Sequence, residues 1–163
     1  MGERGKLGSL DATGLRVAIV AARYNPDIVE SLVEGASAAL AEHGAPGLEE
    51  AVRWVPGCFE IPIAALALAG TGRVDAIVGL GCVIQGETAH FEHVATGVAR
   101  GLMDVGLRTG VPCAFGVLTT YTREQARARA QDAPRGAGNK GREAAEAAIE
   151  MANLLRGIRA STP

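Results

Sequence analysis

The sequence of 163 residues has few aromatic side chains, no long apolar run and no excess of either charge. Phe, Trp and Tyr make up only 4% of the chain, so a core of Ala, Val, Leu and Ile must bring helices close to a sheet. The net charge of −2 gives no reason to expect a nucleic acid or a membrane as partner. No run approaches the roughly 20 apolar residues of a membrane span, and the charged start, Met1 to Lys6, is not expected to be a secretory signal.

Cysteine is also scarce. Cys58, Cys82 and Cys113 are odd in number, widely spaced, and in or beside apolar stretches. Cysteines of this kind are usually reduced and buried. We therefore expect no disulfide framework and a cytoplasmic location.

Apolar runs alternate with helical patterns along the chain, which predicts an α/β fold with a parallel sheet covered on both faces. Four runs have the length and β-branched content of buried strands: Leu15–Ala22, Ala51–Val55, Val74–Val83 and Val111–Leu118. The expected helices are Ile28–His43, Ile61–Ala69, Thr88–Leu107, Arg123–Ala130 and Lys140–Gly157. Gly157 is expected to end the last helix, whose apolar stripe includes Met151 and Ile158.

This pattern predicts one domain, residues 15–163, after an N-terminal segment of residues 1–14 that could add an edge strand to a neighbouring subunit. Ligands of such sheets bind outside the carboxyl ends of the strands. The search for a site therefore narrows to four segments: Ala22–Asp27, Val55–Pro62, Cys82–His90 and Leu118–Arg123.

The first segment places Tyr24 at the carboxyl end of a strand, just before Asn25 and Asp27. A ring at this position can stack on a planar heterocycle. The sequence leaves an alternative equally open, in which Tyr24 covers the end of the core while Asn25 and Asp27 only start the helix.

The second segment has prolines on both sides of Gly57, which predicts a defined turn. Glu60 lies where the next helix begins, a position that favours a carboxylate electrostatically. It could serve only as a cap of that helix, or it could accept hydrogen bonds from a polyol or amide ligand.

The third segment is the most informative, because Gly86 to His90 joins a buried strand to a helix. Free backbone N–H groups at a helix N-terminus, beside the Thr88 hydroxyl, suit a phosphate. His90 in the first helical turn could then shuttle protons near neutral pH. The segment has neither a Walker A loop nor a G-x-G-x-x-G fingerprint, so a nucleotide is not predicted.

Two other interpretations of this segment compete with the phosphate site. His90 could be a capping or surface residue, and Glu87, His90 and His93, three residues apart, could hold a metal. Spacing of three drifts around a helix and no further ligand cluster exists, so we expect no metal.

The fourth segment runs from Phe115 to Tyr121 and ends with two threonines. Downstream lie Arg127 and Arg129 on one expected helix and Lys140 before the next. Such basic residues usually form a solvated face, and they gain a functional meaning only if something brings them to the phosphate turn.

Four motifs, in this order and spacing, resemble the lumazine synthase (6,7-dimethyl-8-ribityllumazine synthase) family from about Leu15 to Ile158. They are Val55-Pro56-Gly57-Cys58-Phe59-Glu60-Ile61-Pro62, Gly86-Glu87-Thr88-Ala89-His90-Phe91-Glu92, Phe115-Gly116-Val117-Leu118-Thr119-Thr120 and Gly138-Asn139-Lys140-Gly141.

The resemblance implies a flavodoxin-like three-layer αβα sandwich with a central four-stranded parallel sheet, and a homopentamer with active sites between neighbouring subunits. The implied reaction condenses 5-amino-6-(D-ribitylamino)uracil with 3,4-dihydroxy-2-butanone 4-phosphate and releases phosphate and water, in riboflavin biosynthesis. It implies no metal and no organic cofactor, and it makes riboflavin synthase a candidate partner.

The resemblance also implies roles for residues, carried over by position. His90 would be catalytic and move protons during imine formation and elimination. The substrate-binding residues would be Tyr24, stacking on the pyrimidine; Asn25 and Glu60, holding the ribityl chain and ring; Cys58, Phe59, Val83, Ile84 and Gln85, through backbone groups; and Glu87 and Thr88, through amides to the phosphate. From the adjacent subunit, Phe115 would close the ring pocket, Arg129 would pair with phosphate and Lys140 would assist.

Some features depart from the family pattern. Tyr24 stands where Phe or Trp is common, Cys58 where Ala is common, and Gln85 where Arg is frequent. The stretch 131–137 is longer than the linker of members that form sixty-subunit shells, which favours free pentamers and leaves a shell open.

Two other functions are weighed against the enzyme. A catalytically silent relative that binds flavins or lumazines is opposed by the intact Glu60, His90 and Arg129. A flavodoxin-like FMN-binding module is opposed by residues 21–26, which are not a hydroxyl-rich phosphate loop.

Overall fold

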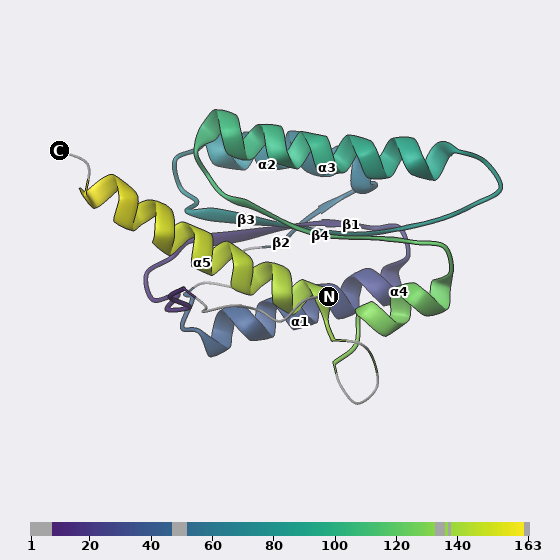
Figure 1. Cartoon of the computed structure of the whole chain (residues 1–163), viewed down its shortest axis with the longest axis horizontal. Helices are drawn as coiled ribbons and strands as arrows, with labels where there is room; N and C mark the ends of the chain where they lie inside the picture. Colours follow the sequence, from purple (N-terminus) through teal and green to yellow (C-terminus); the bar gives the residue numbers. More distant parts are fainter. Residues whose placement is uncertain (1–7, 47–51, 133–135, 137, 162–163) are drawn as a thin grey trace.

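Four strands form one parallel sheet in the order β2-β1-β3-β4 (Figure 1). The computed structural model describes residues 8–46, 52–132, 136 and 138–161. The strands are β1 (Val17–Ala22), β2 (Val52–Val55), β3 (Ala76–Ile84) and β4 (Cys113–Thr120). β1 and β3 are buried along nearly all their length because helices cover both faces, as their continuous apolar sequences predict.

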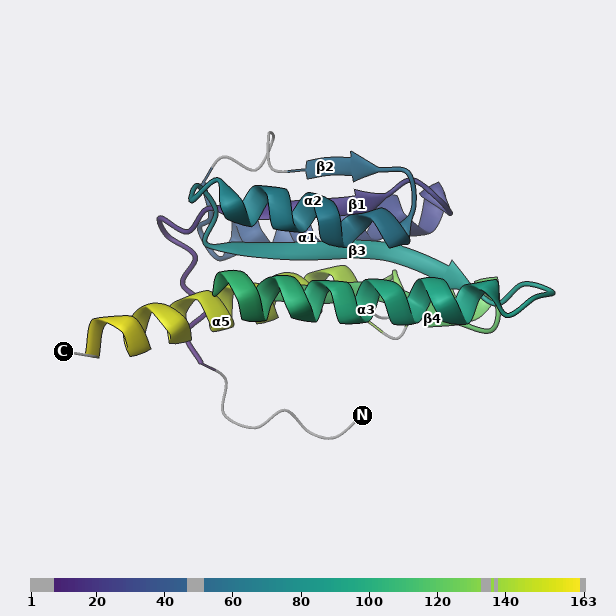
Figure 2. The same cartoon turned by 90° about the horizontal axis from the view of Figure 1, so that it is seen from above.

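Five α-helices make the two outer layers: α1 (Pro26–Glu42), α2 (Ile61–Gly70), α3 (His90–Thr109), α4 (Arg123–Arg129) and α5 (Lys140–Ser161). α2 and α3 cover one face of the sheet, and α1, α4 and α5 cover the other (Figures 1 and 2). The α/β three-layer sandwich expected from the sequence is thus confirmed.

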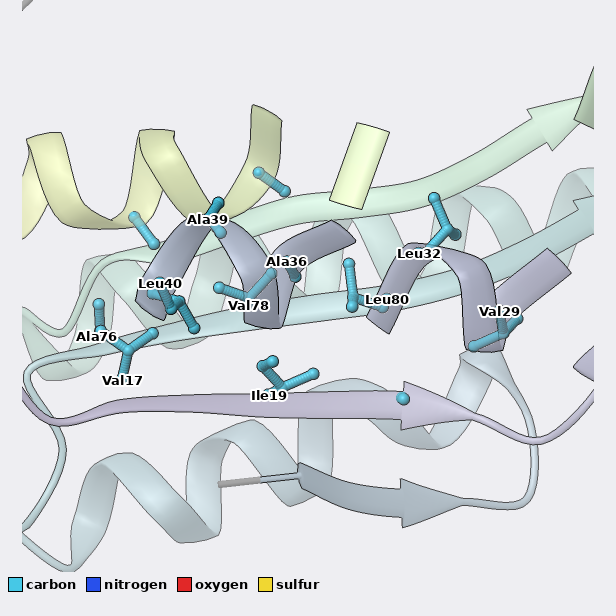
Figure 3. Close-up of a cluster of buried hydrophobic side chains, with 14 of the residues drawn as sticks. Val17, Ile19, Val29, Leu32, Ala36, Ala39, Leu40, Ala76, Val78 and Leu80 are labelled. Atoms are coloured by element: carbon cyan, nitrogen blue, oxygen red, sulfur yellow. The ribbon is translucent and has the colours of Figure 1, made fainter. Parts of the chain in front are cut away.

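The larger core lies between the sheet and α1 and α5. Ile19 of β1 and Val78 and Leu80 of β3 face Leu32 and Ala36 of α1 (Figure 3). Every one of these side chains is essentially inaccessible to solvent. With small residues on the helices, α1 lies close to the strands, as the scarcity of aromatic residues suggested.

Glycines allow the closest approaches between elements. A Cβ added at Gly141 of α5 would overlap the backbone carbonyl of Leu32 in α1. In the other layer, a Cβ added at Gly101 of α3 would lie 2.5 Å from the Pro62 ring of α2. Both helix pairs therefore pack along seams that have no room for a methyl group.

The predicted elements occur in the predicted order, with shifted ends. β3 and β4 begin two residues later than expected and continue further, to Ile84 and Thr120. Gly157 does not end the last helix, which continues to Ser161. Arg159 holds the final turn by donating from Nη2 to the Gly110 carbonyl at 2.6 Å, which offsets the weak helix propensity of an exposed glycine.

The predicted apolar stripe of α5 is wrong at two positions. Met151 and Ile158 are exposed, and the buried face instead contains Ala145, Ile149 and Ala152. An apolar stripe turns gradually around a helix. A prediction that is wrong by one position therefore names side chains that do not contact α1 and the sheet.

The described part of the N-terminal segment, residues 8–14, is not a strand and lies against α5. The Gly8 amide donates to Glu150, and Asn153 donates to the Ser9 and Asp11 carbonyls. Residues 1–7 and most of the linker 131–137 lie outside the described residues. Among the described helices, none is both long and apolar enough to cross a membrane.

Candidate active site

A cavity of about 630 Å³ opens at the carboxyl ends of β1, β2 and β3. Here the chain order of the strands reverses, because β1 is followed by β2 on one side and by β3 on the other. Loops diverge at such a switch point and leave a crevice, where ligands of open α/β sheets bind. The lining residues are Tyr24, Asn25, Gly57, Cys58, Phe59, Glu60, Cys82, Val83, Ile84, His90, Phe91, His93 and Val94.

The turn after β1 places Tyr24 in this cavity with 72% of its side chain exposed. That exposure contradicts the alternative in which Tyr24 covers the end of the core. Asn25 adopts a left-handed conformation with φ 57°, which asparagine tolerates better than most residues. Its Nδ2 donates to the Cys82 carbonyl at 3.0 Å, so the turn is tied to β3 across the switch point.

The turn after β2 brings Glu60 beside the tyrosine. Cys58–Glu60 forms a 3-10 turn that leads directly into α2. Glu60 occupies the N-cap position of α2, but its side chain makes no capping hydrogen bond. Its Oε2 and the Tyr24 ring instead both lie beside Gly57, at 3.1 Å and 3.5 Å from where a Cβ would be. A carboxylate and an aromatic ring therefore face the cavity together, and a larger residue than Gly57 would crowd both.

Two buried thiols form part of the cavity wall. Burial raises the pKa of Cys58 to about 11 and that of Cys82 to about 12. Both thiols therefore stay protonated near neutral pH and cannot act as nucleophiles, which require the thiolate. Cys58 and Cys82 therefore have a structural role in the cavity wall. These two cysteines and Cys113 are all free, as expected.

The segment between β3 and α3 leaves backbone donors exposed. Gln85 to His90 are all solvent-accessible, and Thr88 Oγ1 accepts a hydrogen bond from the His90 amide at 3.4 Å. Within the described residues, the amides of Gly86 to Ala89 have no hydrogen-bond acceptor in the protein. These four amides, just before α3, form a set of free N–H groups of the kind that binds an anion.

α3 begins at His90, two residues later than predicted, and one face of its first turn lines the cavity. Phe91, His93 and Val94, which were not predicted as substrate-site residues, lie beside His90 there. The i, i+3 spacing of the two histidines was the available signal for a shared helix face. No group of three acidic, histidine or cysteine side chains suitable for a metal occurs in the described part of the chain, which leaves the metal interpretation unsupported.

A second cavity, of about 410 Å³, lies along β4 between α4 and α5. It contains Phe115, which is 48% exposed on an edge strand, together with Arg129 and Lys140. It shares no lining residue with the first cavity. Most of the predicted site residues are thus divided between two surfaces of one chain, whereas Gln85, Glu87 and Thr88 line neither cavity and lie in the exposed segment before α3.

Both cations of the second cavity are held by their own helices. Arg129 donates from Nη1 to the Gln125 carbonyl at 3.0 Å, and Lys140 pairs with Glu143 at 2.8 Å. Asn139 fixes the start of α5, because its buried amide donates to the Ser31 and Ala130 carbonyls. The ion pair orients Lys140 toward Glu143, whereas Arg129 has no carboxylate partner within hydrogen-bond reach among the described residues.

Comparison with known proteins supplies the family. The model of the 6,7-dimethyl-8-ribityllumazine synthase family matches residues 14–156. A curated relative, 6,7-dimethyl-8-ribityllumazine synthase 1 of Caulobacter vibrioides, is 50% identical over 144 residues, which cover 88% of this chain and 92% of the relative. A family model over most of the chain and a relative this similar, on a fold with its cavity at the expected switch point, show that the chain belongs to the 6,7-dimethyl-8-ribityllumazine synthase family.

Proposed function

We propose that the chain is a transferase that condenses 5-amino-6-(D-ribitylamino)uracil with 3,4-dihydroxy-2-butanone 4-phosphate to form 6,7-dimethyl-8-ribityllumazine, in riboflavin biosynthesis. Membership of the family carries this proposal. The first cavity supports it, because the exposed Tyr24 ring and the Glu60 carboxylate, which makes no capping hydrogen bond, line one space. The free amides of Gly86 to Ala89 directly precede His90, which also lines this space.

We further propose that the working site joins the first cavity of one chain to the second cavity of a neighbouring copy. Each cavity supplies what the other lacks: the first has the Tyr24 ring and the Glu60 carboxylate, next to the free amides that precede α3, and the second has exposed Phe115 and the cation Arg129. Closed rings of identical subunits are built from such head-to-tail contacts. We therefore propose a homopentamer, with a sixty-subunit shell as the larger alternative.

In this site the pyrimidine stacks on Tyr24, a contact that needs only a flat ring and an exposed aromatic side chain. Glu60 accepts hydrogen bonds from the ring or the ribityl hydroxyls. Asn25 and the backbone of Cys58, Phe59, Val83 and Ile84, which line the cavity, complete the binding surface together with the backbone of Gln85, the next residue. Phe115 of the neighbour covers the other side of the ring.

The butanone phosphate occupies the anion-binding end. The amides of Glu87 and Thr88 donate to its phosphate, and Arg129 of the neighbour donates from a planar guanidinium that can make two hydrogen bonds at once. Lys140 assists from the start of α5.

The chemistry begins when the primary amine attacks the ketone, and loss of water gives an imine. His90, at the first turn of α3, takes and returns protons during imine formation and phosphate elimination. Ring closure with loss of water then gives the lumazine. The amine of the substrate is itself the nucleophile, so no protein nucleophile is needed, in agreement with the protonated state of both cavity thiols.

The direct test mixes the purified protein with the two substrates and follows the fluorescence of the lumazine. We expect formation well above the rate without protein. A rate equal to that background would overturn the proposal. Binding of the lumazine without turnover would instead support the alternative function, a catalytically silent flavin- or lumazine-binding relative.

Assembly and cellular context complete the proposal. Size-exclusion chromatography with light scattering distinguishes the pentamer from the shell, and a monomeric active protein would overturn the shared site. A cytoplasmic location is supported by the three free cysteines, and riboflavin synthase, which uses the product, is the proposed protein partner.

A further inference from the structure

A guanidinium that lines neither cavity holds the turn that carries Tyr24 and Asn25. Arg123 is the first residue of α4, and its Nη1 donates to Asn25 Oδ1 at 3.2 Å. Its Nη2 donates to the Asp27 carboxylate in the first turn of α1. Arg123 therefore contacts the turn on both sides of Pro26, at the point where α4 lies beside the start of α1 (Figure 1).

Asn25 is the residue on which this contact acts. It is the one non-glycine residue with positive φ among those described. Its side-chain amide is fixed at both ends, because Nδ2 donates to the Cys82 carbonyl of β3 and Oδ1 accepts from Arg123. An uncommon backbone conformation persists only where surrounding contacts determine it, and here two of them do.

α4 is a firm support for the guanidinium although it is short. Thr122 caps its N-terminus by accepting from the Gln125 amide, and the Gln125 side chain accepts in return from the Tyr121 amide. Ala126, within α4, is fully buried. The start of α4 is therefore a fixed point against which the turn after β1 is held.

Arg127 provides an internal comparison. It also pairs with Asp27, from Nη2 at 3.2 Å, and it is similarly exposed. It makes no contact with Asn25 in the described structure. Exposed ion pairs of this kind contribute little by themselves, so any difference between Arg123 and Arg127 reports the contact with Asn25.

We propose that Arg123 is a positioning residue for the aromatic half of the site: it fixes Asn25, and through it the direction in which Tyr24 enters the cavity. The inference rests on the proposed function for its readout. It predicts that loss of Arg123 weakens binding of the pyrimidine, which stacks on Tyr24. The phosphate substrate is unaffected, because Arg129 is oriented by its own bond to the Gln125 carbonyl.

The test compares Arg123→Gln with Arg127→Gln, since each change removes one cation paired with Asp27. For the first variant we expect KM for the ribitylaminouracil to rise roughly tenfold, with KM for the butanone phosphate within about twofold of the parent value. For the second we expect both constants within about twofold. Arg123→Lys keeps the charge but reaches only one acceptor, so its KM should fall between the two.

Fluorescence titration with 6,7-dimethyl-8-ribityllumazine gives the same comparison without turnover, and thermal unfolding shows whether each variant is folded. Equal KM and binding constants in the two glutamine variants, with the parent protein active, would overturn the positioning role and leave the proposed function intact. An equal rise in both KM values for Arg123→Gln would also overturn it. A parent protein that neither forms nor binds the lumazine would overturn both proposals.

Discussion

Replacing Arg129 by alanine isolates the charge that the second cavity contributes. Among the described residues of its own chain, this guanidinium makes one hydrogen bond, to the Gln125 carbonyl one turn earlier on the same helix. Its loss should change the free energy of unfolding by no more than about 0.5 kcal/mol, as for most exposed positions. A large effect on turnover would therefore arise in the assembled site and not from an unstable fold.

The expected loss follows from the hydrogen bonds to phosphate. Each charge-assisted hydrogen bond contributes about 1.5–3 kcal/mol. The lost solvation of the charged groups cancels part of the gain from two such bonds, so together they should contribute about 3–4 kcal/mol. kcat/KM should then fall by roughly 10²- to 10³-fold. Steady-state rates of lumazine formation measure this, with Arg127→Ala as the matched control, because Arg127 is exposed on the same helix and lines neither cavity.

A mixing experiment tests whether the site is shared. Subunits carrying Arg129→Ala are unfolded and refolded together with subunits carrying His90→Ala. If His90 and Arg129 of one site come from different chains, about a quarter of the sites in a randomly assembled ring will have both residues intact, and activity will return. If one chain supplied both residues, no mixture could exceed its components. Unchanged kinetics for Arg129→Ala, or no recovery in mixtures shown to co-assemble, would refute the reasoning.

Further predictions concern the first cavity and its walls. Tyr24→Ala should raise KM for the pyrimidine roughly 5- to 150-fold, because stacking contributes about 1–3 kcal/mol, whereas Tyr24→Phe should stay within about twofold in the same assay. Gly81→Ala would press a methyl group against the Cys58 sulfur and should lower the free energy of unfolding by about 1–3 kcal/mol in urea titrations. In a Cys58→Ala background the same change should cost clearly less, and equal costs would contradict the overlap. The raised pKa of Cys58 means that the folded chain holds this proton more tightly than the unfolded chain. The protonated Cys58 thiol makes its full contribution to stability below pH 9, and this contribution is lost as the pH rises to about 11. Urea midpoints should therefore fall across that window, and they should fall less for Cys58→Ala.

The layout of the fold was readable from the sequence because buried parallel strands have continuous apolar runs. β1 and β3 have such runs and were predicted within two residues at each end. Element ends were less predictable, since they depend on contacts far along the chain. The last turn of α5 passes Gly157 because Arg159 reaches Gly110, a bond between residues 49 positions apart.

The site was predictable as a set of strand ends but not as two separate cavities. The position of Tyr24, Glu60 and His90 around one space follows from the rule that ligands bind at the carboxyl ends of parallel strands. The separation of Phe115 from them depends on β4 being an edge strand, which only the sheet order shows. Likewise, the role of Asn25 depends on Arg123, whose side chain comes from 98 residues further along the chain.

The glycine seams between helices divide the chain into positions that can vary and positions that cannot. An added methyl group would meet the Leu32 backbone at Gly141 and the Pro62 ring at Gly101. Even alanine would force the packed helices apart, so we expect almost no substitution at these two positions in relatives or in engineered variants. Tyr24 and Phe59 of the first cavity, in contrast, are exposed over most of their side chains. Variation among relatives and laboratory changes of ligand preference should therefore concentrate at the rim of the sheet, while the seams keep the rim in place.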